Sequence, residues 1–277
     1  MTTLCSTFLR AGLAAAITLA PAMASAQASV ESLLDGAIAG SHRSAANKAR
    51  DPHRHPKETL LFFGLKPDMT VVEVWPDTGW FAEVLIPVLR ERGKYIAAQY
   101  PLEHRQTSRG NREARAAFEA KLKADPAIYD RVAFTEVSAP QVVNMAPPGS
   151  VDMVLTFRSV HVWAVRGNND AMFKAMFDVL KAGGILGVTD HRAKEGTPAR
   201  QQARSGYMAE SYVIEAAEKA GFKLAGRSEI AANPRDTKDY SEGVWALPPS
   251  LSGSENDRAK YIAIGESDRM VLKFVKP

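Results

Sequence analysis

Cysteine is almost absent from the sequence. Among 277 residues there is one, Cys5, and it precedes a short apolar run near the N-terminus. Once that leading segment is removed, the chain cannot form a disulfide, use a thiol as nucleophile or bind a metal through thiolates. The remaining chain must therefore be stabilised by its hydrophobic core, for which a content of 45% hydrophobic residues is ordinary.

Charge is scarce at the N-terminus, where Arg10 is the only charged residue among the first 30. Residues 11–20 are apolar, and residues 24–26 supply the Ala-Ser-Ala pattern that signal peptidases read. We expect a bacterial secretory signal over residues 1–26, cleaved after Ala26, and a periplasmic or secreted protein. An uncleaved anchor is the alternative. The apolar run is too short to span a bilayer permanently, so we expect no stable membrane insertion after cleavage.

Blocks of one charge sign are missing as well. Lys and Arg total 35 against 31 Asp and Glu, which gives a formal net charge of +4, and the charges are scattered. A basic arm for nucleic acid is therefore not expected. Neither the G-x-S-x-G hydrolase elbow nor the Walker phosphate loop occurs. We therefore expect a small-molecule partner and no nucleic acid, and no pattern indicates an oligomeric state.

The most informative stretch is residues 71–81. Valines at 71, 72 and 74 favour a buried strand, and Pro76 cannot continue it because proline lacks an N–H. Gly79 then permits a turn before an apolar helix begins. A strand, a turn and a helix in this order are typical of the ligand-binding start of an α/β domain. The turn contains only one glycine.

Strand and helix patterns alternate along the rest of the chain. Further strands are expected at 94–98, 131–137, 151–157, 185–189, 222–232 and 269–275. Helices are expected at 30–39, 57–63, 79–92, 111–124, 169–181, 210–220 and 257–264. This alternation predicts a parallel sheet with helices on both faces, and the last strand is expected to be antiparallel beside the sixth. We divide the chain into a signal peptide at 1–26, an N-terminal helical arm or lid at 27–64, and an α/β domain at 65–277.

The segment 42–56 within that arm is polar, basic and interrupted by two prolines, and it contains three of the six histidines. It is expected to be an ordered loop or arm rather than a strand. As a lid, it would offer Arg54 and His55 as donors to an anionic group. The plainer interpretation is a solvated basic loop, and a His-x-His pair alone is a weak indication of metal binding.

Four motifs carry a family resemblance: E-V-W-P-x-x-G-W at 73–80, L-K-A-G-G-I-L at 180–186, D-H-R-A at 190–193 and the ending D-R-M-V-L-K-F-V-K-P at 268–277. They resemble predicted class I S-adenosylmethionine-dependent methyltransferases of an exported bacterial branch, over nearly the whole chain from about residue 45. The resemblance implies a Rossmann-like, three-layer fold with a seven-stranded, mostly parallel sheet and an antiparallel last strand. It also implies S-adenosylmethionine as cofactor, bound across the carboxyl ends of the strands.

The same resemblance implies a donor site made of Glu73, Trp75, Asp77, Gly79, Gln99 and Ser138. The family's opening turn reads acid-x-Gly-x-Gly-x-Gly. Glu73 and Gly79 match it, whereas Trp75 and Asp77 stand at the first two glycine places. Gln99 stands where the family usually has an acid for the ribose hydroxyls, and Ser138 where an acid for the adenine amino group is common. An amide accepts hydrogen bonds through one oxygen only.

Catalytic candidates follow the fourth and fifth expected strands. His161 lies just past the fourth, and Asp190 and His191 lie just past the fifth. In an open α/β sheet, both places border the ligand crevice. The three residues could form a general base with its orienting carboxylate, a two-histidine-one-carboxylate metal site, or a structural hydrogen-bond cluster that closes a strand end.

Aromatic and basic residues are expected near the same crevice. Trp75, Trp80 and Trp163 would cluster there, with Trp80 in the core and the other two able to stack on a planar or cationic ligand. Arg158 could pair with a carboxylate or phosphate or form a surface ion pair. Tyr207 is expected to border the substrate pocket.

These patterns leave two hypotheses for function. The first is an S-adenosylmethionine-dependent methyltransferase of an unknown small molecule, with His161 or His191 as base. The second is a degenerate methyltransferase fold that binds a different small ligand or a metal without methyl transfer.

Overall fold

A computed structural model describes residues 28–196 and 198–277. The expected signal peptide at 1–26 and its cleavage point lie outside the described residues. Within the described part, none of the helices combines the length and apolar character needed to cross a membrane.

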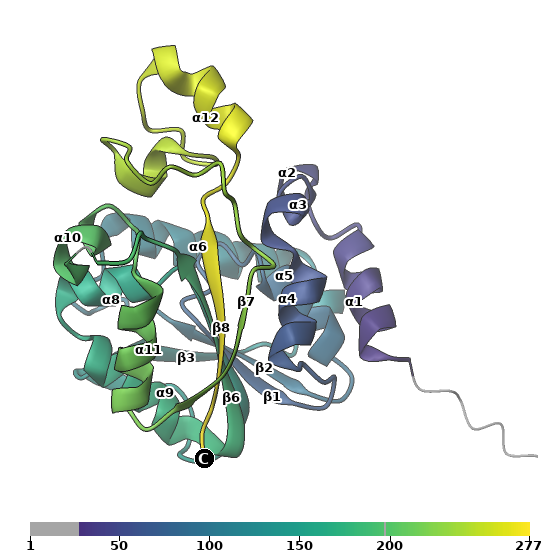
Figure 1. The fold of residues 1–277 in the computed structure, drawn as a ribbon. Helices are drawn as coiled ribbons and strands as arrows, with labels where there is room; N and C mark the ends of the chain where they lie inside the picture. Colours follow the sequence, from purple (N-terminus) through teal and green to yellow (C-terminus); the bar gives the residue numbers. More distant parts are fainter. Residues whose placement is uncertain (1–27, 197) are drawn as a thin grey trace, which may run out of the picture.

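The centre of the molecule is one eight-stranded sheet with the strand order β4-β3-β2-β1-β5-β6-β8-β7 (Figure 1). The strands are β1 (Thr70–Val74), β2 (Lys94–Gln99), β3 (Ala133–Ser138), β4 (Val142–Asn144), β5 (Val151–Phe157), β6 (Leu180–His191), β7 (Lys223–Ser228) and β8 (Arg269–Val275). β1 pairs in parallel with β2 and β5, and β8 is antiparallel to both β6 and β7. The predicted fold class, including the inserted antiparallel last strand, is confirmed. The eighth strand is the short antiparallel edge strand β4, which the sequence analysis did not expect.

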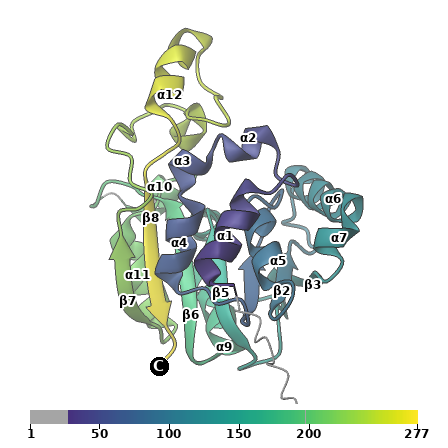
Figure 2. The ribbon, with the colours of Figure 1, turned by 90° about the vertical axis from the view of Figure 1, so that its right-hand side faces the viewer.

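Helices cover both faces of the sheet (Figures 1 and 2). One hydrophobic core joins the sheet to α1 (Val30–Ala39), α4 (Pro56–Phe63), α5 (Ala82–Leu89), α6 (Arg109–Ala124) and α7 (Pro126–Tyr129). The other joins it to α8 (Val160–Arg166), α9 (Asn169–Val179), α10 (Ala199–Arg204) and α11 (Glu210–Lys219). Since successive strand residues point to opposite faces, Val72 and Val74 enter the second core while Val71 enters the first.

The expected loop at 42–56 is wrong in its secondary structure. It contains the short helices α2 (Ala45–Lys48) and α3 (Asp51–Arg54). The Ser44 hydroxyl accepts a hydrogen bond from the backbone N–H of Asn47 and caps α2. Pro52 lies in the first turn of α3, where its missing N–H costs nothing.

Three other expected boundaries are also wrong. The strand expected at 222–232 is β7, which ends at Ser228. The helix expected at 79–92 is α5, which begins three residues later, at Ala82. The helix expected at 169–181 ends at Val179, and β6 runs from Leu180 to His191. The glycines expected to close that helix lie inside the strand, where the N–H of Gly183 donates to the carbonyl of Lys276. Asp190 and His191 therefore end β6 rather than follow it.

The connection from β7 to β8 forms a cap above the sheet (Figure 1). It contains two short 3-10 helices, Gly243–Ala246 and Glu255–Asp257, followed by α12 (Arg258–Ile264). A small apolar cluster around Tyr261 and Leu247 stabilises it. The cap lies at the end of the molecule where the parallel strands have their carboxyl ends, which is where open α/β sheets bind ligands.

Candidate functional site

The turn after β1 has the backbone of a glycine-rich turn with other residues in it. Trp75 has a φ of 53°, Asp77 of 57° and Gly79 of 83°. A left-handed backbone costs a non-glycine residue roughly 1–2 kcal/mol, and such strain is concentrated at functional sites. The backbone therefore keeps the conformation for which the family uses glycine, while the side chains differ.

The side chain of Trp75 fills the space beyond the ends of β1, β2 and β3. It is 3% exposed and stacks on Tyr100 with ring centroids 4.6 Å apart. Its Nε1 donates a 2.9 Å hydrogen bond to the carbonyl of Val137 in β3. Trp163 meets it edge-on at 5.8 Å, and the Arg166 guanidinium lies 5.3 Å from its ring centroid. The indole is thus fixed from several sides.

Two of the other implied donor residues carry buried polar atoms without partners. Gln99 is fully buried, and neither its Nε2 nor its Oε1 has a hydrogen-bond partner among the described residues. The Oγ of Ser138 is in the same situation. Such atoms mark places where water or a ligand group belongs.

Glu73 and Gly79 form the rest of the implied donor site. Burial raises the pKa of Glu73 to about 7, although the Tyr95 hydroxyl donates to it at 2.6 Å and favours the charged form. A Cβ at Gly79 would lie 2.5 Å from the Phe118 ring, so this position requires glycine for space as well as for its backbone.

S-adenosylmethionine does not fit these residues in the pose that the resemblance implies. That pose places the ribose at the end of β2 and the adenine beyond β3. The Trp75 indole lies between these two strand ends, stacked on Tyr100 and hydrogen-bonded to β3. Adenosine and the indole cannot occupy the same space.

His161 and Asp190 meet as predicted. The two lie at the carboxyl ends of neighbouring strands, and His161 Nδ1 is 2.9 Å from Asp190 Oδ1. The fully buried carboxylate also accepts hydrogen bonds from the backbone N–H groups of His161 and His191, at 3.2 and 2.8 Å. Because a carboxylate only accepts, the neutral form of the His161 imidazole carries its proton on Nδ1 and has the free lone pair on Nε2.

His191 has a different environment. Its Nδ1 lies 2.5 Å from the Ser267 hydroxyl, and its ring centroid is 5.7 Å from that of His161. Burial lowers the pKa of His191 well below its usual value, and nearby Arg269 lowers it further. His191 is therefore neutral at ordinary pH. Among the described residues, no group of three or more His, Asp or Glu side chains could hold a metal ion, so the metal alternative gains no support.

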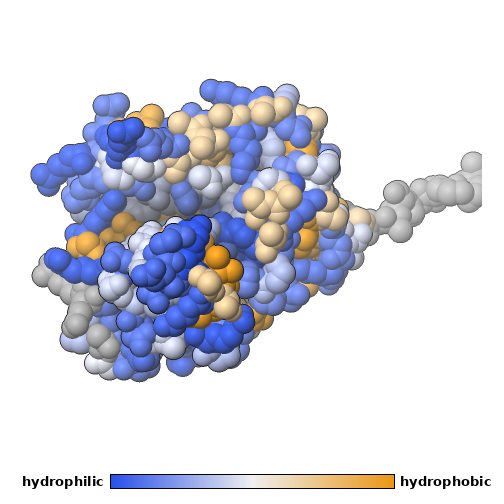
Figure 3. Space-filling model, turned by 90° about the horizontal axis from the view of Figure 1, so that it is seen from above, coloured by the Kyte–Doolittle hydropathy of each residue, from blue (hydrophilic) through white to orange (hydrophobic). Residues whose placement is uncertain are grey.

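His161 borders an open groove of about 450 Å³ between α8, α10 and the cap. Val162, Val165 and Trp245 contribute an apolar wall, and the Trp245 ring, 41% exposed, meets the His161 ring edge-on at 6.3 Å. Figure 3 looks onto this end of the molecule, where largely hydrophilic residues surround a hollow. Sequence reasoning missed Trp245, because it lies in a long connection without periodicity.

The other aromatic residues predicted for the site do not border this groove. Trp163 is fully buried against Phe173 and offers no face to a ligand, and Tyr207 is buried with its hydroxyl donating to Asp236. The expected cluster of three tryptophans is wrong, because Trp80 belongs to the opposite core. Its ring lies under the guanidinium groups of Arg43 and Arg54.

His55 joins α3 to α4 with a φ of 44° and is not among the residues that line the pockets described here. Arg54 and Arg158 do come together. They line a second, smaller pocket with Arg269, a residue that the sequence analysis did not single out.

Solved structures share this architecture. A S-adenosylmethionine-dependent methyltransferase from Aquifex aeolicus matches with a TM-score of 0.53 and 17% identity, over 83% of this chain and 93% of its own. Geranyl diphosphate methyltransferase in complex with S-adenosylmethionine matches with a TM-score of 0.53 and 12% identity, over 88% and 95%. The chain has the class I methyltransferase fold.

The fold has hosted other activities as well. The [4+2]-cyclase SpnF matches with a TM-score of 0.54 and 17% identity, over 90% of this chain and 93% of its own. No protein-family model matches the sequence, and the comparison with curated proteins finds no match. At these identities the likeness concerns the fold, and function must be argued from the site.

Proposed function

We propose that this protein is an enzyme that transforms a small molecule bound in the groove beside His161, with His161 as general base. The observation that carries the proposal is the pairing of His161 with a fully buried carboxylate, Asp190, while His161 also borders the groove. A histidine oriented by a buried carboxylate is a recurrent arrangement for proton transfer.

The chemistry follows from the hydrogen bonds of the pair. Asp190 keeps the proton of the neutral imidazole on Nδ1, so Nε2 can take a proton from an O–H or N–H group of a ligand. The imidazolium formed is then stabilised by the adjacent carboxylate. The exposed ring of Trp245 and the valine side chains of α8 favour a planar, largely apolar substrate.

The proposed setting is extracytoplasmic. The N-terminal pattern at 1–26 supports export to the periplasm or beyond, with a small molecule rather than nucleic acid as partner. S-adenosylmethionine is made in the cytoplasm, so an exported enzyme would be separated from its source. This separation agrees with the position of the Trp75 indole, which lies where the adenosine of the implied pose would bind.

Methyl transfer from S-adenosylmethionine is the second candidate function. It is supported by the fold, shared with structures named as methyltransferases, and by the unpartnered buried atoms of Gln99 and Ser138 at two donor positions. It requires the Trp75 side chain to leave its present place.

The proposal is tested by NMR on protein with 15N-labelled histidine. His161 should show a proton on Nδ1, and Asp190→Asn should remove this preference. Phenol, a planar probe with an O–H group, should shift the His161 Nε2 resonance in the wild type and much less in Trp245→Ala. Ile262→Ala, which removes an exposed side chain of α12 that does not line the groove, is the matched control. An unchanged response in Trp245→Ala, or no response in the wild type, contradicts the proposal.

A further inference from the structure

A second pocket, which we name the arginine pocket, lies on the other side of the strand ends. It is small and partly open, with a free volume of about 10 Å³, which is room for about one water-sized group, and it is lined by Arg54, Thr59, Phe81, Phe157, Arg158, Thr189, Ala231 and Arg269. These residues come from α3, α4, the turn before α5 and the ends of three strands. None of them borders the groove beside His161.

Positive charge exceeds negative charge around the arginine pocket. Four guanidinium groups gather there, those of the three lining arginines and that of Arg50. Two carboxylates face them: Glu266 pairs with Arg50, Arg54 and Arg269, and Asp77 lies 3.4 Å from Arg158. The cluster therefore has two more positive than negative charges.

This excess is buried, which makes it costly. Arg54 is 5% exposed and Arg269 is 4% exposed. Burial lowers the pKa of Arg54 well below its usual value, and Arg158 and Arg269 lower it further. Uncompensated charge in such a place is unfavourable unless a counter-charge binds.

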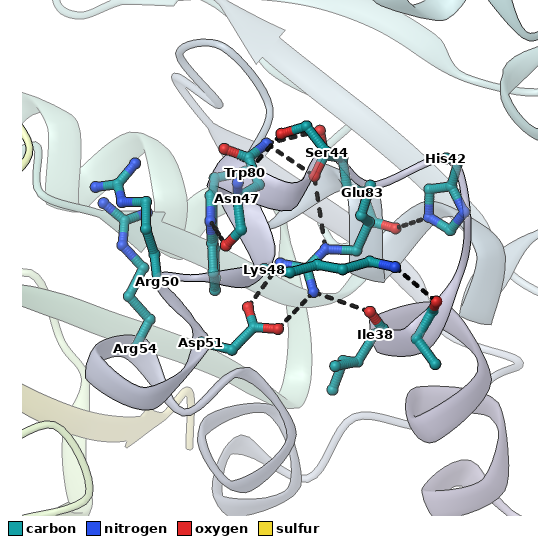
Figure 4. A network of polar contacts seen from close by, with 12 residues as sticks. Ile38, His42, Ser44, Asn47, Lys48, Arg50, Asp51, Arg54, Trp80 and Glu83 are labelled. Carbon is teal, nitrogen blue, oxygen red and sulfur yellow. Dashed lines mark hydrogen bonds and ion pairs between the residues drawn. The ribbon is translucent and has the colours of Figure 1, made fainter.

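The arginines also have free donors. Nη2 of Arg54 and Nε of Arg269 are buried without a hydrogen-bond partner among the described residues. Figure 4 shows the guanidinium groups of Arg50 and Arg54 side by side, away from Asp51. Two buried arginines that line one pocket and keep unused N–H groups are suited to receive an oxyanion.

The rest of the lining indicates what the anion is attached to. Phe81 and Phe157 stack with ring centroids 3.7 Å apart and form an apolar wall, and Thr59 and Thr189 add hydroxyl groups. Arg158 has a left-handed backbone, with a φ of 60°, and its N–H donates to the carbonyl of Thr189. Backbone strain of this kind is concentrated at functional sites.

From this geometry we infer that the arginine pocket binds the carboxylate or phosphate group of a small molecule, with Arg54, Arg158 and Arg269 as donors. It is a site separate from the groove beside His161 and does not depend on the proposed base. The free volume is small, so only the anionic group enters, and the phenylalanine wall favours a ligand whose apolar body lies at the open side of the pocket.

The test is calorimetric titration of the wild-type protein with phosphate, acetate and benzoate at constant ionic strength. Binding of at least one is expected. Tighter binding of benzoate than acetate would assign an organic carboxylate, and preference for phosphate a phosphoryl group. Arg158→Gln should weaken binding about tenfold or more, because one charged donor is lost. Arg158 is the appropriate target because it is half-buried and makes only the long contact to Asp77, so the variant should fold.

Arg109→Gln is the control. It removes the same charge from an exposed position on α6. The inference is overturned if none of the three anions binds, if Arg158→Gln binds as the wild type does, or if Arg109→Gln weakens binding equally.

Discussion

At the scale of single residues, the interpretation of the donor site depends on Trp75. Its identity is visible in the sequence, and so is its departure from the glycine of the family pattern. What the sequence cannot show is where the indole goes. Stacking on Tyr100 and a hydrogen bond to Val137 depend on residues 25 and 62 positions away, which only the folded sheet brings together.

Trp75→Gly should open a cavity that free indole fills. Losing a buried tryptophan costs about 3–5 kcal/mol of stability, and relief of the left-handed backbone returns about 1–2 kcal/mol. We therefore expect a net loss of about 3 kcal/mol in chemical denaturation. Added indole should restore part of it by binding the folded state. Trp245→Gly, which removes a half-exposed ring, should lose less stability and gain nothing from indole at the same concentration.

Glu73 should make stability depend on pH. Its folded-state pKa is raised from 4.5 to about 7, so between these values the folded protein retains a proton that the unfolded chain releases. Stability is unaffected by this group below pH 4.5 and falls as pH rises towards 7, by about 3 kcal/mol in total. Glu73→Gln should be more stable than the wild type at pH 8 and equal to it at pH 4. A difference that is constant with pH would contradict this account, and Glu113→Gln, on an exposed face of α6, should show no difference.

At the scale of elements, the segment 42–56 shows a limit of sequence reasoning. Its polarity and prolines are equally compatible with a loop and with short helices. The helices form because buried partners from distant elements fix them: Glu83 of α5 contacts Asn47, Arg43 and Lys121, as Figure 4 shows in part, and Glu266 binds α3 to β8. Local patterns contain no information about such partners.

Glu266→Gln should release α3. Burial alone would raise the pKa of Glu266, but three surrounding guanidinium groups outweigh it and hold this pKa well below its usual range. The carboxylate therefore contributes stability above pH 4.5, and this contribution is lost only as pH falls through the depressed value. Leaving the arginines unpaired should cost about 3–5 kcal/mol at pH 7.

Hydrogen exchange followed by mass spectrometry distinguishes this local effect from general loosening. Exchange should accelerate first at residues 50–55 in Glu266→Gln. Glu255→Gln, which changes an exposed carboxylate in the same cap, should exchange as the wild type does. Uniform acceleration across the sheet would show that Glu266 does not act through α3.

At the scale of the whole molecule, the fold was predictable and the activity was not. Seven strands, their order of appearance and the antiparallel insertion follow from apolar runs and from motifs near β1, β6 and β8. The pairing of His161 with Asp190 was also predictable, because parallel strands end at one edge. Trp245 in the groove and Glu266 beside the arginines were not predictable, since the cap that contains both has no periodic pattern. Arg269 begins β8, an expected strand, but its place in the arginine pocket was not predictable.

Export is a further whole-molecule prediction. Produced from its full sequence in a Gram-negative host, the protein should be recovered from the periplasm with Gln27 as its first residue, as read by N-terminal sequencing. Ala26→Arg should prevent cleavage, because signal peptidase accepts small residues at that place. A full-length cytoplasmic product from the wild-type sequence would contradict the prediction.

The most direct test of the central claim is calorimetric titration of the wild-type protein with S-adenosylmethionine and S-adenosylhomocysteine. Because the Trp75 indole occupies the adenosine position, we predict no binding with a Kd below about 1 mM for either compound. Micromolar binding by the wild type would contradict the claim. It would show that Trp75 leaves its place and that the donor site binds the methyltransferase cofactor.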